Sequence, residues 1–423
     1  MTPRKLTLRK SITVILRKQR ALNSFILFIL LFIFVVHVLS QVPLWGVYYT
    51  SYQQRYNLGG EGALLDSQVY ALAGWNYVHG ISPDRINFAH PPLAKYIIGS
   101  SQLVFDSENL LSIVFGVATL VAVYLIARKI LPTYFALVPT FILAFDRMFL
   151  WLSSSSMLDI YATFFAVISV LIFMSFRRSR WLWIPLGVAI GLSFASKWTG
   201  IFIVPALLGF AAMKRDRRAL LSLALSLPMA ALLYTGVYAG YFAAGHSFQD
   251  FVALQLRMLG EQSRVRYNRG TPPPLWLLFN FITGIEGVGP WTHLFANWTT
   301  RTLDTTSVQY GIFTLISYNP LTWPSSFIAS VFVPLYAWRH GDREALLPAL
   351  VFFSMVGATS YGQVFFWYLL PALPFGFISL GYVLSLAKSS WKSSRTKLFL
   401  GGYLILVVVW SLYLALPGFI AVR

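Results

Sequence analysis

The stretch from Asn109 to Lys129, NLLSIVFGVATLVAVYLIARK, decides the fold class. Residues 109–127 contain no charged side chain, and two basic residues, Arg128 and Lys129, follow at once. A transmembrane helix needs about 20 mostly apolar residues, and basic residues gather at its cytoplasmic end. The stretch therefore predicts a membrane-spanning helix whose inner end lies at Arg128.

Similar apolar runs occur along the whole chain. Of 423 residues, 57% are hydrophobic and 11% are charged, and the mean hydropathy is +0.66, whereas a soluble domain carries about 25% charge. We therefore predict a single all-α polytopic membrane domain over residues 1–423, with no soluble domain. The eleven predicted spans are 21–43, 109–127, 132–151, 157–175, 181–195, 197–213, 219–242, 326–338, 344–360, 364–387 and 398–419.

The charges predict the orientation of these spans. With a cytoplasmic N-terminus and an uncleaved first helix, the inner stretches hold 22 of the 33 Lys and Arg residues, and the outer side holds 11 of the 14 Asp and Glu residues. This is the positive-inside pattern. It accounts for the net charge of +19 without nucleic acid as a partner. Merging the two spans around Lys197 into one kinked helix would destroy the pattern.

Two long outer segments, residues 44–108 and 243–325, are rich in Tyr, Trp, Gly and Pro. They are too polar to span a membrane and too aromatic to be disordered linkers, so we expect re-entrant or interfacial helices. Function usually lies in such loops when a rigid scaffold positions them. We therefore expect the catalytic residues in the first segment.

Within the first segment, Asp66 opens a helix-like stretch that places Val69, Tyr70 and Ala73 on its own face. Asp is also a common residue at helix starts, so a structural role is the alternative. The string HPPLAK follows, and its two prolines suit the start of a helix. His90 and Lys95 bracket this string with a titratable group and a cation.

Further candidates lie at helix ends. Asp159 follows a run of serines, and Arg147 follows Asp146. Instead of binding a ligand, Arg147 could form a structural ion pair with Asp146 or Asp159. Lys197 and Trp198 occupy an outer turn. The alternative to a binding role for Lys197 is that its side chain only extends to the membrane interface. In the second segment, Arg264 and Arg266 belong to an arginine cluster that suits an anion such as phosphate, although a solvated charge run has the same composition.

Several classes of protein lack their usual motifs. HExxH, GxSxG and GxxxxGK[ST] are absent, which removes sequence support for a metalloprotease, an α/β-hydrolase or a P-loop ATPase. The chain has no cysteine, and its six histidines lack metal-ligand spacing. The metal question stays open, because Asp66 and Asp159 would suit a shared divalent ion.

Taken in order, these motifs resemble the protein O-mannosyltransferase family, membrane glycosyltransferases of the GT-C type. The resemblance rests on the acid at Asp66, HPPLAK, Leu158-Asp159, GLSFASKWTG at 191–200 and FFWYLLPALPF at 365–375. It implies a GT-C bundle of about eleven helices, a polyprenyl-phosphate sugar donor, a hydroxyl acceptor and an outward active site. The family usually has a glutamate where this chain has Ser67, and an arginine where it has Asn109.

The residues and the resemblance together suggest a mechanism. Asp66 would act as general base, and cations would stabilise the departing phosphate. The groups expected to bind the donor are His90, Lys95, Arg147, Asp159, Lys197, Trp198, Arg264 and Arg266. We expect mannose transfer from dolichyl or another polyprenyl phosphate to Ser or Thr of proteins, in the cell membrane of a prokaryote. A lipid or glycan acceptor, a non-catalytic carrier of lipid-linked sugar and a dimeric state are left open.

Overall fold

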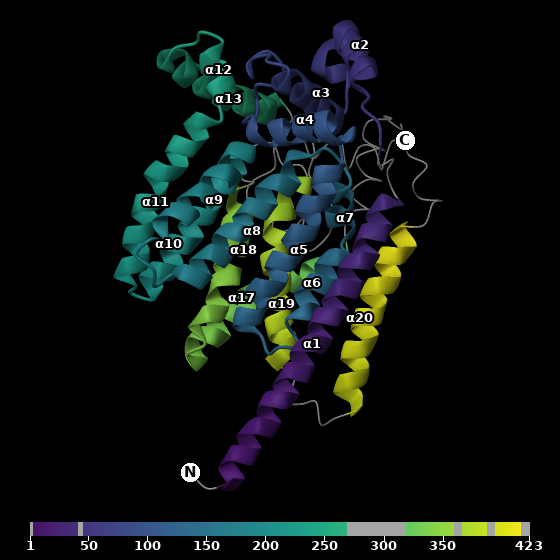
Figure 1. Cartoon of the computed structure of the whole chain (residues 1–423), viewed down its shortest axis with the longest axis vertical. Coiled ribbons are helices and arrows are strands. Elements are labelled where there is room, and N and C mark those ends of the chain that lie inside the picture. Colours follow the sequence, from purple (N-terminus) through teal and green to yellow (C-terminus); the bar gives the residue numbers. More distant parts are fainter. Residues whose placement is uncertain (1–2, 41–44, 269–318, 359–365, 387–393, 416–423) are drawn as a thin grey trace.

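The computed structural model describes residues 3–40, 45–268, 319–358, 366–386 and 394–415. Every regular element in these ranges is a helix (Figure 1), and pairing of extended backbone is limited there to one isolated bridge between Gly46 and Ser107. The prediction of an all-α protein is therefore confirmed for the described part of the chain.

A bundle of helices forms the body of the molecule, and each predicted span coincides with one helix or one pair of helices. The bundle helices are α1 (Pro3–Leu39), α5 (Leu110–Ile130), α6 (Leu137–Ala144), α7 (Arg147–Ser153), α8 (Leu158–Phe176), α9 (Trp183–Ser196), α10 (Ile203–Met213), α11 (Arg217–Gly236), α17 (Trp323–His340), α18 (Leu346–Ala358), α19 (Leu373–Leu386) and α20 (Ser394–Ala415).

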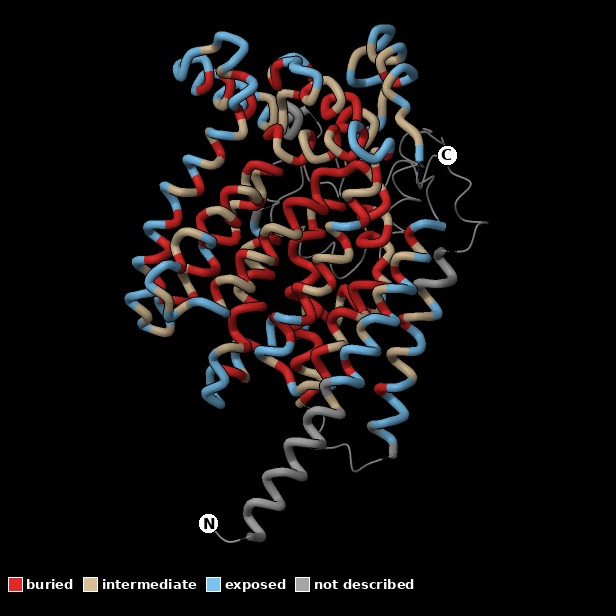
Figure 2. Tube along the Cα trace, viewed as in Figure 1, coloured by how far each residue is buried: buried red, intermediate tan, exposed pale blue. Residues whose placement is uncertain are grey.

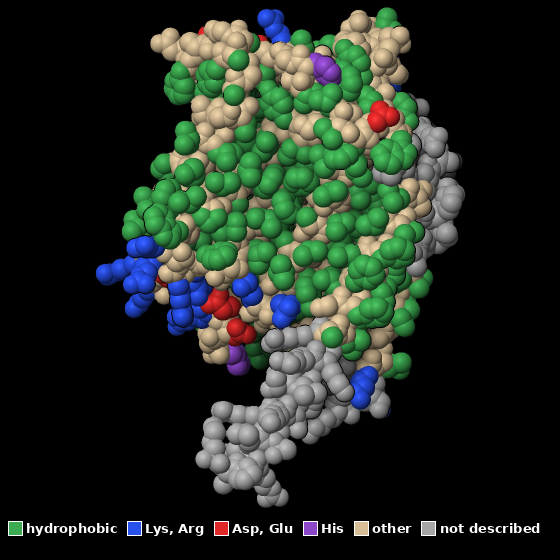
Figure 3. All heavy atoms as spheres, in the orientation of Figure 1, with side chains coloured by type: hydrophobic (Ala, Val, Ile, Leu, Met, Phe, Trp, Pro, Cys, Tyr) green, Lys and Arg blue, Asp and Glu red, His purple; other side chains and the backbone are tan. Residues whose placement is uncertain are grey.

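Five helical segments in the described ranges are long and apolar enough to cross a membrane by themselves. They are Ala21–Leu39, Leu110–Ile130, Leu158–Phe176, Arg217–Gly236 and Trp367–Leu386. On the face drawn in Figure 3, hydrophobic side chains form a broad band around the bundle, and most visible Lys and Arg side chains gather beyond one edge of it. The protein is thus an integral membrane protein, while the count of eleven crossings stays a prediction.

Short helices cover the other end of the bundle (Figure 1). The first outer segment forms α2 (Tyr49–Gly59), a 3-10 turn η1 (Gly60–Ala63), α3 (Asp66–Val78) and α4 (Leu93–Phe105). After α11 come α12 (Ala239–Ala243) and α13 (Phe248–Asn268). Most of the second outer segment lies outside the described residues.

The core runs along the middle of the bundle (Figure 2), and exposed residues lie along the peripheral helices α1, α11 and α20. Large side chains such as Phe149, Tyr161, Trp323 and Phe352 are fully buried there. Several buried hydroxyl groups donate to the carbonyl oxygen one turn earlier, as Ser330 does to Ser326 at 2.8 Å. These bonds satisfy polar groups where water is excluded.

The predicted span 132–151 differs from the structure, because the helix breaks at Phe145 and Asp146. The Asp146 carboxylate caps α7 by accepting from the Phe149 amide at 3.0 Å, and it also accepts from Trp323 Nε1 at 2.8 Å. A side chain that satisfies free amides at a helix start stabilises a new helix there. The break was not predicted, because the segment is apolar on both sides of it and was therefore read as one span.

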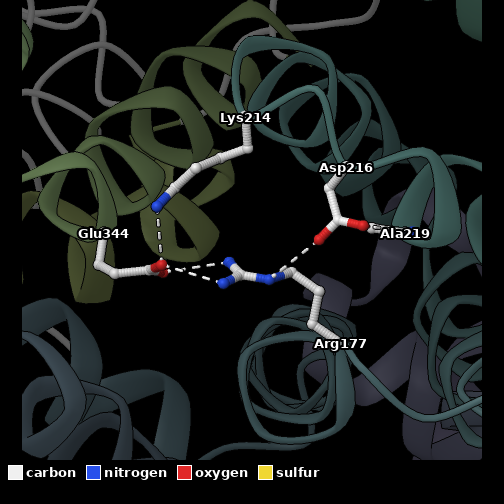
Figure 4. Close-up of polar contacts among 5 residues, drawn as sticks. All are labelled: Arg177, Lys214, Asp216, Ala219 and Glu344. Carbon is white, nitrogen blue, oxygen red and sulfur yellow. Dashed lines mark hydrogen bonds and ion pairs between the residues drawn. The ribbon is translucent and has the colours of Figure 1, made fainter.

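The chain reverses direction at Lys197, between α9 and α10. Arg177, which follows α8, and Lys214, which follows α10, both bond to Glu344, so the ends of these helices lie together (Figure 4). The Arg177 guanidinium lies between Glu344, at 3.1 Å, and Asp216, at 3.3 Å. Two helices therefore connect this end of the bundle to Lys197 at the other end, rather than one kinked helix.

Candidate active site

Asp66 is the first residue of α3, as the sequence predicted. The preceding residue, Leu65, is extended, and its backbone amide donates to the Gln68 side chain at 3.1 Å, which fixes the start of the helix. Val69, Tyr70 and Ala73 are buried, whereas Asp66 is exposed. The helix therefore presents its carboxylate at the open end of a buried face.

His90 lies in the loop that precedes α4, and the two prolines after it lead into the helix at Leu93. The ring of His90 meets the edge of the Tyr70 ring, with centroids 5.9 Å apart. Desolvation of His90, followed by the nearby charges of Lys197 and Lys95, lowers the pKa of His90 well below its ordinary value. The imidazole is therefore neutral near pH 7, and a neutral imidazole has one nitrogen that can donate and one that can accept a hydrogen bond.

Lys95 is fully buried beneath the same loop. Its Nζ donates to the carbonyl oxygen of Asn87 and, at 2.8 Å, to that of His90. Glu61 holds the other side of the loop by accepting from the Asn87 amide at 2.8 Å and from its side chain at 3.1 Å. The Lys95 side chain, which was predicted to bind phosphate, thus fixes the loop backbone at His90.

Lys197 and Asp159 form a buried ion pair at the mouth of the bundle. Lys197 Nζ lies 2.6 Å from Asp159 Oδ1 and 3.5 Å from the centre of the Tyr368 ring. The Asp159 atom Oδ2 is buried and has no hydrogen-bond donor among the described residues. A buried carboxylate oxygen without a donor is costly, so this atom is suited to accept from a ligand hydroxyl.

Tyr70 lies near both Asp66 and the Asp159 carboxylate. Burial, followed by the charges of Asp66, Tyr368 and Asp159, raises the pKa of Tyr70 well above its ordinary value. The charge of Asp66 also acts on Lys197 and favours its protonated form. We call the resulting set the outer cluster, which consists of Asp66, Tyr70, His90, Asp159, Lys197 and Tyr368. It combines an exposed carboxylate with a buried lysine at one end of the bundle.

Other predicted site residues lie elsewhere. Arg147 begins α7, and it lies near enough to His37 of α1 to act on it electrostatically. Trp198 donates from Nε1 to the Tyr234 hydroxyl at 2.8 Å and so joins α11 to the turn at Lys197. Arg264 and Arg266 belong to the last turns of α13, and their side chains lie outside the described residues.

Asn109, one of the two positions where the chain departs from the family resemblance, is hydrogen-bonded within the protein. Asn109 precedes α5, and its Oδ1 accepts from Ser156 at 3.0 Å. Its neighbour Glu108 accepts from the Tyr52 hydroxyl at 3.0 Å. Burial raises the pKa of Glu108 to about 7. A hydrogen-bonded amide and carboxyl thus occupy the position of the expected arginine.

Tyr70 and Tyr368 were not among the predicted site residues. Tyr70 lies one helical turn after Asp66, on the face that the sequence assigned to it. Tyr368 belongs to the motif FFWYLLPALPF, from which no single residue was selected. Both tyrosines could have been predicted from the sequence, because each belongs to a stretch that was already assigned to the site.

The described residues do not gather three or more carboxylate or histidine groups at one point. Two carboxylates, Asp66 and Asp159, face the same region, and the positive charge that both sense is the ammonium of Lys197. A divalent ion usually needs a larger set of oxygen ligands. The residues of the outer cluster do not by themselves fit a metal site.

Comparison with solved structures identifies the fold. The structure of oligosaccharyltransferase AglB from Archaeoglobus fulgidus, in complex with an inhibitory peptide and a dolichol-phosphate, matches with a TM-score of 0.53 and 14% identity. The match covers 94% of this chain and 56% of AglB, so the chain spans about half the length of that protein. ArnT from Cupriavidus metallidurans, bound to undecaprenyl phosphate, matches with a TM-score of 0.56 and 13% identity over 95% of this chain and 76% of ArnT. The fold is that of the GT-C membrane glycosyltransferases.

Comparison with protein families agrees with this class. Residues 89–239 match the family described as dolichyl-phosphate-mannose-protein mannosyltransferase. The resemblance inferred from the motifs is thus confirmed for a segment that contains His90, Lys95, Asp159 and Lys197. Asp66 and Tyr368 lie outside it. Comparison with the curated proteins gives no match.

Proposed function

We propose that this protein is a glycosyltransferase that moves a sugar from a polyprenyl-phosphate carrier to a hydroxyl acceptor at the outer face of the membrane. The observation that carries the proposal is the outer cluster, in which the exposed carboxylate of Asp66 lies near enough to the buried Lys197–Asp159 pair to act on Lys197 electrostatically. The carriers bound in the AglB and ArnT structures support a lipid phosphate as the donor group. The family match supports mannose as the sugar and a protein as the acceptor, and we propose Ser or Thr as the residues that carry the acceptor hydroxyl.

In the proposed reaction, Asp66 takes the proton of the acceptor hydroxyl while the hydroxyl oxygen attacks the anomeric carbon. The bond from that carbon to the phosphate oxygen breaks, and the polyprenyl phosphate leaves as an anion. Lys197 stabilises the developing charge on the phosphate. Asp159 fixes the ammonium through Oδ1 and offers Oδ2 to a hydroxyl of the sugar.

His90 and Tyr70 supply neutral hydrogen-bonding groups between these charges. Lys95 and Glu61 position His90 through the loop backbone, so Lys95 acts on the donor phosphate only indirectly, through the position of this loop. Arg147, Trp198, Arg264 and Arg266 are proposed as outer contacts of the donor. The site lies at the membrane surface, so the isoprenoid tail remains among the lipids while the phosphate reaches Lys197.

The test compares Asp66→Asn with Asp106→Asn in purified full-length protein reconstituted in vesicles. Asp106 is also an acid of the first outer segment, and its φ of 51° is one that asparagine tolerates. Radiolabelled polyprenyl-phosphate mannose is the donor, and a Ser/Thr peptide or a lipid extract is the acceptor. Asp66→Asn should lower transfer by about 10²–10⁴-fold, the usual contribution of a general base, and Asp106→Asn should leave it unchanged.

Three outcomes would contradict parts of the proposal. Unchanged transfer by Asp66→Asn would remove the base assignment. Sugar found only in the lipid extract would replace protein with a lipid or glycan acceptor. Carrier binding without transfer to any acceptor would make the wild-type protein a carrier of lipid-linked sugar rather than an enzyme.

A further inference from the structure

We propose that α13 is an interfacial helix that lies among the headgroups of the outer leaflet and inserts an apolar stripe into the lipid. The stripe consists of Phe248, Val252, Leu256 and Leu259, with exposed fractions of 63%, 43%, 64% and 37%. At 3.6 residues per turn these positions fall within about 80° of arc. The partner that this surface fits is the membrane surface itself.

Three distinct faces distinguish α13 from a helix on a water-facing surface. One face, with Phe251, Leu254 and Met258, is buried against the protein. The stripe adjoins this face, and the polar residues Gln249, Asp250 and Arg257 lie on the remaining side. A surface helix in water needs one apolar face and one polar face. A second, exposed apolar face is typical of a helix that lies in the membrane interface.

The helix that precedes α12, α11, also exposes apolar side chains. This helix is one of the segments long and apolar enough to span a membrane, and its Leu221, Leu225 and Leu232 are exposed by 62%, 46% and 69%. The chain passes from α11 through α12 directly into α13 (Figure 1). Two aromatic residues of α12, Tyr241 and Phe242, lie at this junction, and aromatic side chains favour the membrane interface.

Polar side chains of α13 contact the loop that carries His90 and the neighbouring helix α11. The Arg257 guanidinium lies 3.8 Å from the centre of the Phe88 ring, and Gln262 Nε2 donates to the carbonyl oxygen of Ala89 at 3.1 Å. Gln255 accepts from the Tyr234 hydroxyl at 2.6 Å. A helix held at the lipid surface would therefore set the height of the His90 loop above the membrane.

The absence of cysteine from the sequence allows a direct test. Val252→Cys and Leu256→Cys place a nitroxide label on the stripe, and Ala253→Cys, one residue beyond Val252, is the matched control on the water-facing side. The full-length protein is reconstituted in vesicles of three parts phosphatidylcholine and one part phosphatidylglycerol. Collision rates with oxygen, which concentrates in lipid, and with a water-soluble nickel chelate are measured by electron paramagnetic resonance.

The labels at 252 and 256 should favour oxygen, whereas the label at 253 should favour the nickel chelate. Equal access of the chelate to all three positions would overturn the proposal. Protection of 252 and 256 from both reagents would also overturn it, because protein rather than lipid would then cover the stripe. The measurement involves no sugar transfer, so its outcome is independent of the proposed enzymatic function.

Discussion

Lys95 is a fully buried lysine whose Nζ donates to two backbone carbonyl oxygens and lies 5.6 Å from the centre of the Tyr77 ring. Burial lowers the pKa of Lys95 to about 7, and the charge of Glu61 only partly opposes this effect. A neutral amine has two N–H groups, which match the two carbonyl oxygens. The loop at His90 is therefore held well by the uncharged form.

This shift predicts how stability depends on pH. Between about pH 7 and the unfolded value near 10.4, the unfolded chain binds a proton at Lys95 that the folded chain does not, so stability rises with pH in this window. Lys95→Met removes this contribution. The difference in Tm between wild type and Lys95→Met should shift in favour of wild type from pH 6.5 to pH 9.5. A difference independent of pH would mean that Lys95 stays charged in the folded protein.

Two helices of the outer cap, α3 and α4, cross at Gly74 and Gly99 with their backbones in contact. A Cβ atom added at Gly99 would lie 2.1 Å from the carbonyl oxygen of Gly74, and one added at Gly74 would lie 2.4 Å from that of Lys95. Only glycine permits such an approach. Since α3 carries Asp66 and Tyr70 and α4 carries Lys95, the crossing sets the geometry of the outer cluster.

Gly99→Ala should therefore separate α3 from α4. Overpacking costs about 1–3 kcal/mol, and a shift of Asp66 by about 1 Å should lower sugar transfer about 10²-fold. Gly209→Ala in α10 is the matched control, because a Cβ there meets no atom within 4 Å. The readouts are Tm in detergent and the transfer rate. Retention of both by Gly99→Ala would show that the helices can separate without affecting the site.

The whole molecule has chemically different ends. The outer cluster lies among α3, α8 and η5 (Phe366–Ala372), while Arg177, Lys214, Asp216 and Glu344 join three loops at the other end (Figure 4). Hydrogen bonds from Arg177 and Lys214 outweigh the effect of burial and lower the pKa of Glu344. Its carboxylate therefore stays ionised and holds the three loops together.

This arrangement predicts the sidedness of the protein. Leu58→Cys, at a position exposed by 89% in α2, should react with a membrane-impermeant maleimide in intact cells. Arg178→Cys, at an exposed position after α8, should react only after permeabilisation. The cysteine-free wild type controls for background labelling. Labelling of Arg178→Cys in intact cells would reverse the predicted orientation and place the outer cluster in the cytoplasm.

The sequence by itself determined the approximate positions of most helices, with the break at Asp146 as an exception, because apolar length and flanking charge are local properties. It also determined the predicted orientation. It also located the starts of α3 at Asp66 and of α4 after Pro92, since helix starts depend on nearby residues. The tertiary structure alone decided how the charges combine. The partners Asp159 and Lys197 are separated by 38 residues, and Tyr368 lies far from both in the chain. The direction of Lys95, toward carbonyl oxygens rather than the open site, likewise depends on how α4 packs under its own loop, which no local pattern encodes.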